Sequence, residues 1–120
     1  MKLTAIQPIL YSMDIEESII FYCEVLGFRL ISSSENLSWV RFQKDEVQLM
    51  VSKAPDSVSF SKPIFTGSLY MVCEDVSAIW EALKDTVEVC YELEDFEWGM
   101  REFGIYDNNG FVLQFGEEIK

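Results

Sequence analysis

The chain has 120 residues, of which 49 % are hydrophobic and 14 % aromatic, and its formal net charge at neutral pH is −12. This length and apolar content are enough to bury one ordinary core, which excludes a disordered chain and an array of large domains. The strongly acidic surface repels phosphate backbones, so nucleic acid is not expected as a partner.

Histidine is absent, which removes the commonest transition-metal ligand and the usual proton shuttle near neutral pH. The three cysteines, Cys23, Cys73 and Cys90, form neither a CxxC pair nor an even-numbered disulfide framework. The first residues do not have the pattern of a secretory signal, and no apolar run is long enough to span a membrane. These features predict a cytoplasmic protein that has no membrane partner.

The first half of the chain predicts a strand, a helix and three more strands. Asp14 is a helix N-cap, and Glu17 stands where a capping box places its second acidic residue. Apolar residues then recur at helical spacing until Gly27, which predicts a helix over 14–26. Period-two alternation and polar turns predict strands over 3–11, 28–32, 38–43 and 47–52.

The second half repeats this order of elements. Asp75 is the matching N-cap and lies 61 residues after Asp14, and it precedes a helix predicted over 76–84. Strands are predicted over 68–73, 87–93, 100–106 and 112–115. The Asn108-Asn109-Gly110 sequence is a strong turn signal, because Asn and Gly tolerate positive φ.

The repeated order predicts an α+β fold of two βαβββ modules that form one curved, cup-like mixed sheet with the helices outside. Module 1 covers 1–53, a Ser- and Pro-containing linker covers 54–66, and module 2 covers 67–120. The inner face of such a sheet is a natural ligand site. Within the linker, Phe60, Ile64 and Phe65 either cap an apolar site or only anchor a loop.

Three segments carry a resemblance to a known superfamily. They are Ser12-Met13-Asp14-Ile15-Glu16-Glu17-Ser18-Ile19-Ile20-Phe21-Tyr22 with Val25-Leu26-Gly27-Phe28, then Val72-Cys73-Glu74-Asp75-Val76, then Trp98-Gly99-Met100-Arg101-Glu102-Phe103 with Asp107 and Gly110. In this order they resemble the vicinal oxygen chelate superfamily, which includes glyoxalase I, bleomycin-resistance proteins and extradiol dioxygenases. The third segment is similar to the bleomycin-resistance branch. The resemblance implies the cup-like fold and a homodimer, but it says less about function.

Family members that hold a metal use one ligand from each of four strands, and the resemblance places those positions on Gln7, Gln48, Ser68 and Gln114. Neutral amide and hydroxyl oxygens are weak ligands for a divalent transition metal, so neither a metal nor another cofactor is expected. The four side chains either hydrogen-bond to one another across a polar cavity floor or orient a ligand. Strand alternation adds Ile9, Met50, Tyr70 and Val112 to the same faces.

Aromatic and charged residues leave further alternatives open. Trp39, Tyr91 and Trp98 could form an aromatic wall for a planar or cationic ligand, or belong to the core or to a dimer rim. Arg101 beside Glu102 indicates a structural ion pair more often than an anion clamp. The acidic residues of 88–97 form either a solvated edge or a cleft that attracts a cationic drug.

The sequence therefore predicts a metal-free, small-molecule-binding protein of the bleomycin-resistance type that sequesters a cationic or aromatic drug or metabolite, as in antibiotic resistance. The predicted ligand-binding residues are Gln7, Gln48, Ser68, Tyr70, Gln114, Trp39, Trp98, Arg101 and Glu102, with no catalytic residue. The alternative is a lyase or isomerase of the same superfamily with altered chemistry, in which Glu46, Glu102 or a cysteine thiolate acts as base or nucleophile. A third possibility is a domain whose ligand belongs to neither class.

Overall fold

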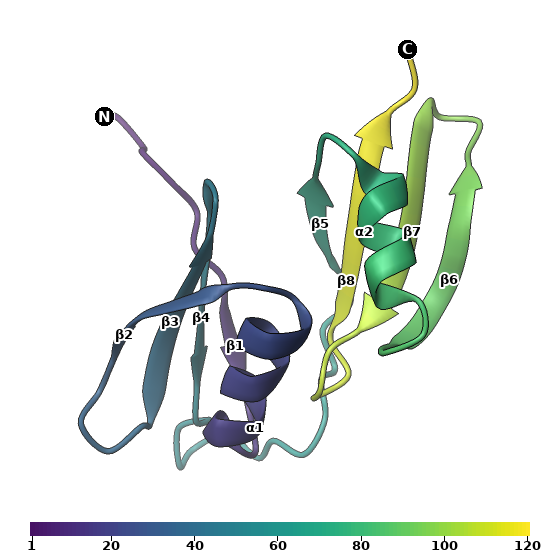
Figure 1. Ribbon diagram of the computed structural model, residues 1–120. Helices are drawn as coiled ribbons and strands as arrows, with labels where there is room; N and C mark the ends of the chain where they lie inside the picture. The colour runs from purple at the N-terminus through teal and green to yellow at the C-terminus, as the bar shows by residue number, and fades with distance from the viewer. The chain divides into compact units, whose positions relative to one another are not determined.

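The computed structural model describes all residues from 1 to 120 and divides into two compact units, Met1–Ser61 and Lys62–Lys120 (Figure 1). Their boundary falls inside the segment 54–66 that the sequence predicts as a linker. Unit 1 contains β1 (Ile9–Tyr11), α1 (Ile15–Ile20), the π-helix η1 (Phe21–Val25), β2 (Arg29–Ser33), β3 (Trp39–Lys44) and β4 (Val47–Ser52). Unit 2 contains β5 (Leu69–Val72), α2 (Val76–Leu83), β6 (Glu88–Asp95), β7 (Met100–Tyr106) and β8 (Val112–Glu118).

The β-α-β-β-β order predicted for each half is confirmed, and each unit has its own four-stranded mixed sheet. The strand orders are β1-β4-β3-β2 and β5-β8-β7-β6, so the first strand of each unit pairs with its last. The pairs β1–β4 and β5–β8 are parallel and the remaining pairs are antiparallel. In both units a helix covers one face of the sheet (Figure 1), and we call the opposite face the open face.

The first helix begins where the sequence predicts and then widens. The Asp14 side chain accepts a hydrogen bond from the backbone N–H of Glu17 at 3.1 Å, as an N-cap does. The last turn is a π-helix, in which the Leu26 N–H donates to the Phe21 carbonyl. This turn holds the ring of Tyr22, fully buried, stacked 5.2 Å from Phe42 of the sheet. The widened turn thus positions the largest core residue of unit 1.

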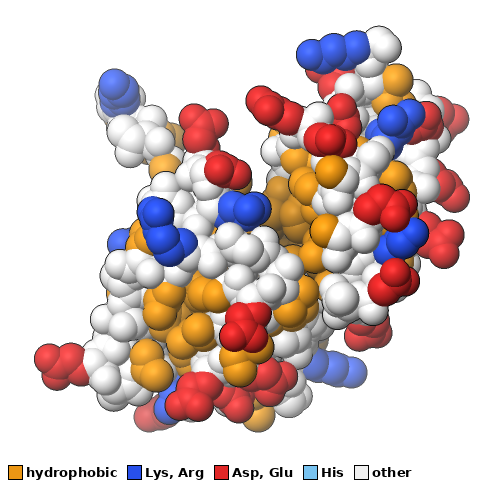
Figure 2. Space-filling view, in the orientation of Figure 1, with side chains coloured by type: hydrophobic (Ala, Val, Ile, Leu, Met, Phe, Trp, Pro, Cys, Tyr) orange, Lys and Arg blue, Asp and Glu red, His pale blue; other side chains and the backbone are white.

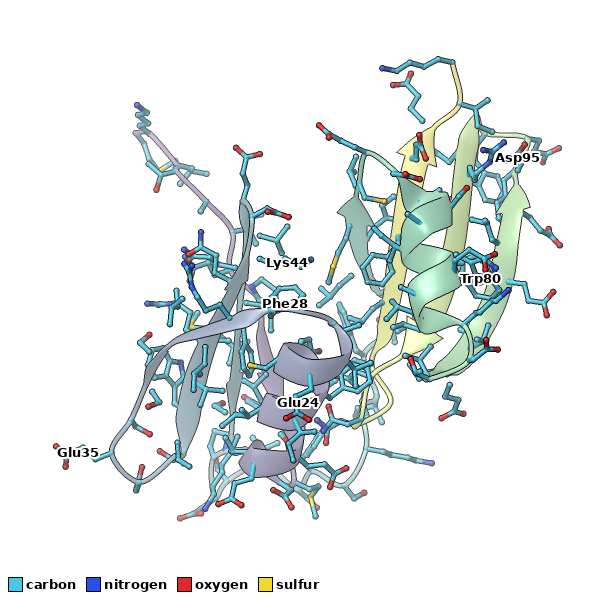
Figure 3. The ribbon with its side chains drawn as sticks, viewed as in Figure 1. Glu24, Phe28, Glu35, Lys44, Trp80 and Asp95 are labelled. Atoms are coloured by element: carbon cyan, nitrogen blue, oxygen red, sulfur yellow. The ribbon has the colours of Figure 1, made fainter.

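The second helix is joined to its sheet at both its start and its middle. Asp75 caps it by accepting from the Ala78 N–H at 3.2 Å, and the Glu117 carboxylate of β8 accepts from the Val76 N–H at 3.0 Å. From the middle of α2, Trp80 points to the sheet (Figure 3) and packs 5.1 Å from Phe103. The Phe103 ring stacks in turn on Phe115, so α2 and the sheet face that it covers enclose the apolar core of unit 2.

The bounds of two strands differ from those predicted by more than two residues. A strand over 3–11 was expected, but β1 starts only at Ile9, and Leu3 and Ile6 are exposed. Pro8 has no N–H to donate, so the hydrogen-bonded ladder cannot extend through it. Conversely, β8 continues past Phe115 to Glu118, because its pairing with β7 outweighs the low strand preference of Gly116 and the acidic residues. Neither helix is long and apolar enough to cross a membrane.

Candidate functional site

The open face of unit 2 carries a row of side chains from all four strands. In register, Tyr91 of β6 lies opposite Gly104 of β7, Gly104 opposite Gln114 of β8, and Gln114 beside Tyr70 of β5. Because side chains alternate between faces, the neighbours Phe103 and Leu113 point into the helix-covered core. The same alternation places Glu102 with this row, on the open face.

Glu102 is the centre of a hydrogen-bond network, and its side chain is almost completely buried, with 3 % of the residue exposed. One carboxylate oxygen accepts from the Tyr70 hydroxyl at 3.0 Å and from the Trp98 indole N–H at 2.8 Å. The other oxygen accepts from the Tyr91 hydroxyl. The Tyr91 oxygen also accepts from the Gln114 amide at 2.8 Å, and the Ser68 hydroxyl donates to Gln114. Three side chains of the second unit therefore donate directly to this carboxylate, Gln114 is linked to it through Tyr91, and Ser68 is linked through Gln114 and Tyr91.

Two glycines give the tyrosines room to reach Glu102. A Cβ atom on Gly104 would overlap the ring of Tyr91, with Cδ1 only 2.8 Å away, and a Cβ atom on Gly116 would overlap the Tyr70 hydroxyl. Any larger residue at either position would push a phenol off the sheet. These glycines are thus a steric requirement of the network.

The network fixes the protonation states of its members. Burial by itself raises the pKa of Glu102, but hydrogen bonds from Tyr91, Trp98 and Tyr70 outweigh burial and lower that pKa below its ordinary value. Burial first, and then the hydrogen bond to Glu102, raise the pKa of Tyr70 to about 12 and also raise the pKa of Tyr91. At neutral pH the site therefore holds one carboxylate and two neutral phenols.

Alkaline titration of phenolate absorbance should detect Tyr70 ionising near pH 12, and Glu102→Gln should move this step down toward 10.0. A raised folded-state pKa means that the contribution of Tyr70 to the free energy of unfolding is complete below about pH 10 and is lost as the pH rises to 12. The contribution of the Glu102 carboxylate to the free energy of unfolding changes with pH in the opposite direction. It is lost as the pH falls through the lowered pKa of Glu102. The Tyr70→Phe variant identifies the step, and an unchanged titration in Glu102→Gln would contradict the assignment.

A pocket of about 380 Å³ opens beside Glu102. Its aromatic wall is the pair Phe96 and Trp98, whose rings are stacked 4.6 Å apart and nearly parallel, with Tyr91 edge-on to Phe96. Trp98 remains 62 % exposed, so one face of this wall is available. Glu92, Glu94 and Gln114 complete the lining, and acidic side chains are spread over the surface of the second unit (Figure 2). The arrangement suits a flat molecule with a positive charge.

The four positions aligned with metal ligands form two hydrogen-bonded pairs, one in each unit. Gln7 donates its amide N–H to the Gln48 oxygen at 2.8 Å, and Ser68 donates to the Gln114 oxygen. All four groups are neutral, and no group of three His, Cys, Asp or Glu residues in the chain is placed to hold a metal ion. Such a donor set does not fit the divalent metal that the fold family implies, since no anion offsets the metal charge.

The other predicted residues, Arg101 and Trp39, are not among the residues that line the pocket beside Glu102. Arg101 forms an ion pair, but with Asp95 and not with its neighbour Glu102: its Nε lies 2.6 Å from the Asp95 Oδ1 atom. Consecutive strand residues point to opposite faces, so Arg101 and Glu102 cannot share one site on the sheet. Trp39 belongs to the open face of unit 1, where Arg41 lies over its ring. Of the linker residues, Phe60 packs edge-on against Tyr11 at 5.9 Å, whereas Ile64 and Phe65 are exposed.

Sequence reasoning missed Phe96 and both glycines. The strand pattern contains a usable signal, because Gly104 lies two residues after Glu102 and Gly116 two residues after Gln114. A glycine on the same face as a polar site residue marks a place where another side chain crosses the sheet. Phe96 has no such signal, because its role depends on the turn before β7, where its N–H donates to the Met100 carbonyl.

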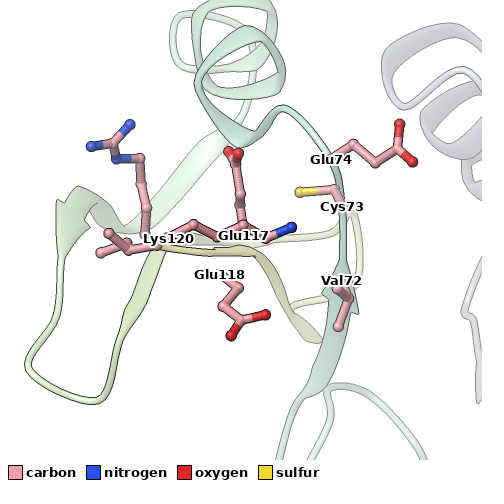
Figure 4. Close-up of a pocket in the computed structure, with 8 residues that line it drawn as sticks. Val72, Cys73, Glu74, Glu117, Glu118 and Lys120 are labelled. Atoms are coloured by element: carbon pink, nitrogen blue, oxygen red, sulfur yellow. The ribbon is translucent and has the colours of Figure 1, made fainter.

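A second hollow, of about 580 Å³, lies where β5 and β8 end and is less suited to a ligand (Figure 4). Three of the polar side chains that line it already have structural partners. Glu117 caps α2, the Cys73 thiol donates to the Gly116 carbonyl, and Arg101 is paired with Asp95. Burial raises the pKa of the Cys73 thiol, which disfavours the reactive thiolate.

Comparison with known proteins agrees with this fold. The family model of the glyoxalase/bleomycin resistance protein/dioxygenase superfamily matches residues 4–115. A bleomycin resistance protein of Geobacillus stearothermophilus is 26 % identical, with 94 % of this chain and 96 % of that protein covered.

Solved structures with the same fold are also similar to this chain. A crystal structure of a protein of unknown function from Agrobacterium tumefaciens has a TM-score of 0.81 at 25 % identity, covering 99 % of this chain and 97 % of the other. TnmS3, an antibiotic binding protein from a Streptomyces species, has a TM-score of 0.78 at 20 % identity and covers 98 % of both chains. The chain therefore belongs to the glyoxalase/bleomycin resistance protein/dioxygenase superfamily.

Proposed function

We propose that this protein binds a small cationic aromatic molecule in the pocket beside Glu102, without a metal and without catalysing a reaction on it. The observation that carries the proposal is a buried carboxylate, held ionised by three donors, directly behind a partly exposed aromatic wall. The bleomycin resistance relative and the antibiotic-binding structural neighbour support a function in drug sequestration.

The physical basis of recognition is a combination of stacking and charge. A flat ring can lie on the free face of Trp98, which the stacked Phe96 holds in place. A positive charge on that ring gains from the π-electrons of the wall and from Glu102, Glu92 and Glu94 around the pocket. An anionic ring of the same shape would be repelled.

A matched pair of probes tests this proposal. Proflavine and acridine share one ring system, but proflavine is a cation at slightly alkaline pH and acridine is neutral there. Calorimetric titration should give proflavine an affinity at least about tenfold higher, and Trp98→Ala should weaken proflavine binding by at least about tenfold. The control is Phe65→Ala, which removes an exposed aromatic residue outside the pocket. Equal affinity for both probes, or equal losses in both variants, would refute the proposal; bleomycin can be titrated in the same way.

The metal-free part of the proposal predicts no stoichiometric zinc, nickel, cobalt or manganese in untagged protein, and no glyoxalase I turnover when these ions are added. That reaction needs a Lewis acid and a carboxylate base, and the chain offers Gln114 at the position of the family's last ligand. The triple variant Gln7→His, Ser68→His, Gln114→Glu should gain metal affinity if the four positions converge. Elemental analysis that finds one metal per wild-type chain would overturn this part.

The competing function is an enzyme of the same superfamily that uses Glu102 or a cysteine as base or nucleophile. The lowered pKa of Glu102 makes it a weak base, and burial raises the pKa of the Cys23 and Cys73 thiols. Glu46 lies exposed in the turn between β3 and β4 and has no hydrogen-bond partner that would orient it as a base. We therefore favour the binding function.

We also propose that the protein is a cytoplasmic homodimer. All three cysteines are free thiols, which suits a reducing compartment. The exposed apolar side chains include Ile9 on β1 and Val72 on β5, the latter 75 % exposed, and a second copy could cover them. Light scattering at micromolar concentration should give twice the mass of one chain, and Val72→Asp should shift the population toward monomer if β5 is in the interface. A monomer for the wild-type protein would contradict the dimer.

A further inference from the structure

The open face of unit 1 holds an arginine that has no acidic partner. Arg41 is partly buried in the middle of β3, and its guanidinium forms no ion pair, although 21 of the 120 residues are acidic. Its only hydrogen-bond acceptor is the Met50 sulfur, 3.6 Å from Nη2, which is a weak acceptor. A guanidinium has five N–H donors, so most of its hydrogen-bonding capacity is unused.

A second unused group lies next to it. Ser32 of β2 is the register partner of Arg41, which puts both side chains on one face of neighbouring strands. The Arg41 Nε atom and the Ser32 Oγ atom are both buried, and both are without a hydrogen-bond partner. Buried polar atoms without partners are rare, and two on adjacent positions indicate that a third group belongs between them.

The surroundings define what this group must be. The Trp39 ring holds the guanidinium in place, with its centroid 5.2 Å from the arginine Cζ atom. The N–H donors of Arg41 are therefore oriented before a ligand binds. Beside Met50 the amides of Gln7, Gln48 and Gln43 are hydrogen-bonded in a chain and offer no competing negative charge. Both Arg41 Nε and Ser32 Oγ can donate, and a planar oxyanion is the partner that best matches two donors on neighbouring strands.

We propose that Arg41 and Ser32 form a binding subsite for the carboxylate or sulfonate of an aromatic acid. This subsite is built from residues of unit 1, whereas the pocket beside Glu102, which selects the opposite charge, is built from residues of unit 2. The proposal of the subsite does not depend on the function proposed above. The net charge of −12 disfavours anions in general, so any anion that binds must owe its affinity to a local cation.

A pair of fluorescent probes tests the subsite. The probes 8-anilino-1-naphthalenesulfonate and N-phenyl-1-naphthylamine share one aromatic skeleton, and only the first has a sulfonate. Titrations should be run at moderately high ionic strength, which screens the general charge of the protein. In the wild type the sulfonate probe should bind more tightly than its neutral analogue, in spite of the acidic surface.

The variants separate the local effect from the general one. Arg41→Met keeps an unbranched side chain over Trp39 and should weaken binding of the sulfonate probe by at least about tenfold, with no change for the neutral probe. Arg41→Lys should weaken binding of the sulfonate probe less than Arg41→Met does, and Ser32→Ala should weaken it less than Arg41→Lys does. The control is Arg29→Met, which makes the same charge change at an exposed position of β2 and should leave both probes unaffected.

Four results would overturn the proposal. Three are undetectable binding of the sulfonate probe, equal loss of its binding in Arg41→Met and Arg29→Met, and equal loss of binding for both probes in Arg41→Met. The fourth is unaltered sulfonate binding in both Arg41→Met and Ser32→Ala. Circular dichroism and thermal melting show whether Arg41→Met is folded, and Ser32→Ala provides a second variant if it is not. Unaltered sulfonate binding in both Arg41→Met and Ser32→Ala would mean that the two buried atoms share only a water molecule.

Discussion

Glu102→Gln should weaken proflavine binding by about 10- to 100-fold and lower the free energy of unfolding by about 1–3 kcal/mol. The loss of binding follows from removing the negative charge that is hydrogen-bonded to Trp98 of the aromatic wall. Acridine, which carries no charge, should be affected far less. The ratio of the two affinities therefore separates loss of charge from loss of the pocket.

The destabilisation follows from the hydrogen bonds that an amide would have to replace. One carboxylate oxygen of Glu102 accepts hydrogen bonds from Tyr70 and Trp98, and the other accepts one from Tyr91. In either orientation a glutamine would turn its NH₂ group toward a donor, because an indole N–H cannot accept and the Tyr91 oxygen already accepts from Gln114. A buried donor without a partner would remain.

The matched control is Glu74→Gln, which makes the same charge change at an exposed position of unit 2, outside this pocket. It should leave the proflavine affinity and the stability nearly unchanged. If the two glutamine variants behave alike, the role assigned to Glu102 is wrong.

Gly104→Ala should have an effect of similar size through shape alone. The added methyl would overlap the ring of Tyr91, which would then lose its hydrogen bonds to Glu102 and Gln114. We expect a loss of about 1–3 kcal/mol in denaturant unfolding, as for other overpacked sites. The proflavine affinity should fall by at least about tenfold, because Tyr91 lines the pocket.

Two further variants make this expectation specific. Gly67→Ala is the control, because its Cβ would meet only the ring of exposed Phe65 at 3.4 Å, an ordinary contact distance. The double variant Gly104→Ala, Tyr91→Ala removes the overlap, so its loss of stability should be smaller than the sum of the two single losses. Additive losses would show that Gly104 does not act through Tyr91.

Much of the fold could be predicted from the sequence because each element has a local signal. Asp14 and Asp75 cap their helices as predicted, and β4 and β7 have the predicted bounds. Local signals fail where long-range pairing decides, as at Pro8 and at the end of β8. The π-helical turn also could not be predicted from the sequence, because one extra residue in a helical turn hardly changes the spacing of the apolar residues.

The candidate site could be predicted only in part. The motif positions located Gln114 and Ser68, and Glu102 was proposed as a ligand contact, but its three donors come from three separate segments of the chain. Their convergence depends on the sheet register, which spacing along one strand does not reveal. Arg41 could not be predicted as a site residue, because only the structure shows that an arginine in a strand has no acidic partner.

The most direct measurement is a heteronuclear NMR titration of the three tryptophan indole N–H groups with proflavine. The indoles of Trp39, Trp80 and Trp98 lie on the open face of unit 1, against the core of unit 2 and at the proposed pocket. Single substitutions assign each resonance. We expect the Trp98 resonance to shift with the binding curve and to shift less or not at all in Glu102→Gln, while the Trp80 resonance stays in place. A shift of Trp39 or Trp80 with Trp98 unmoved would contradict the assignment of the pocket.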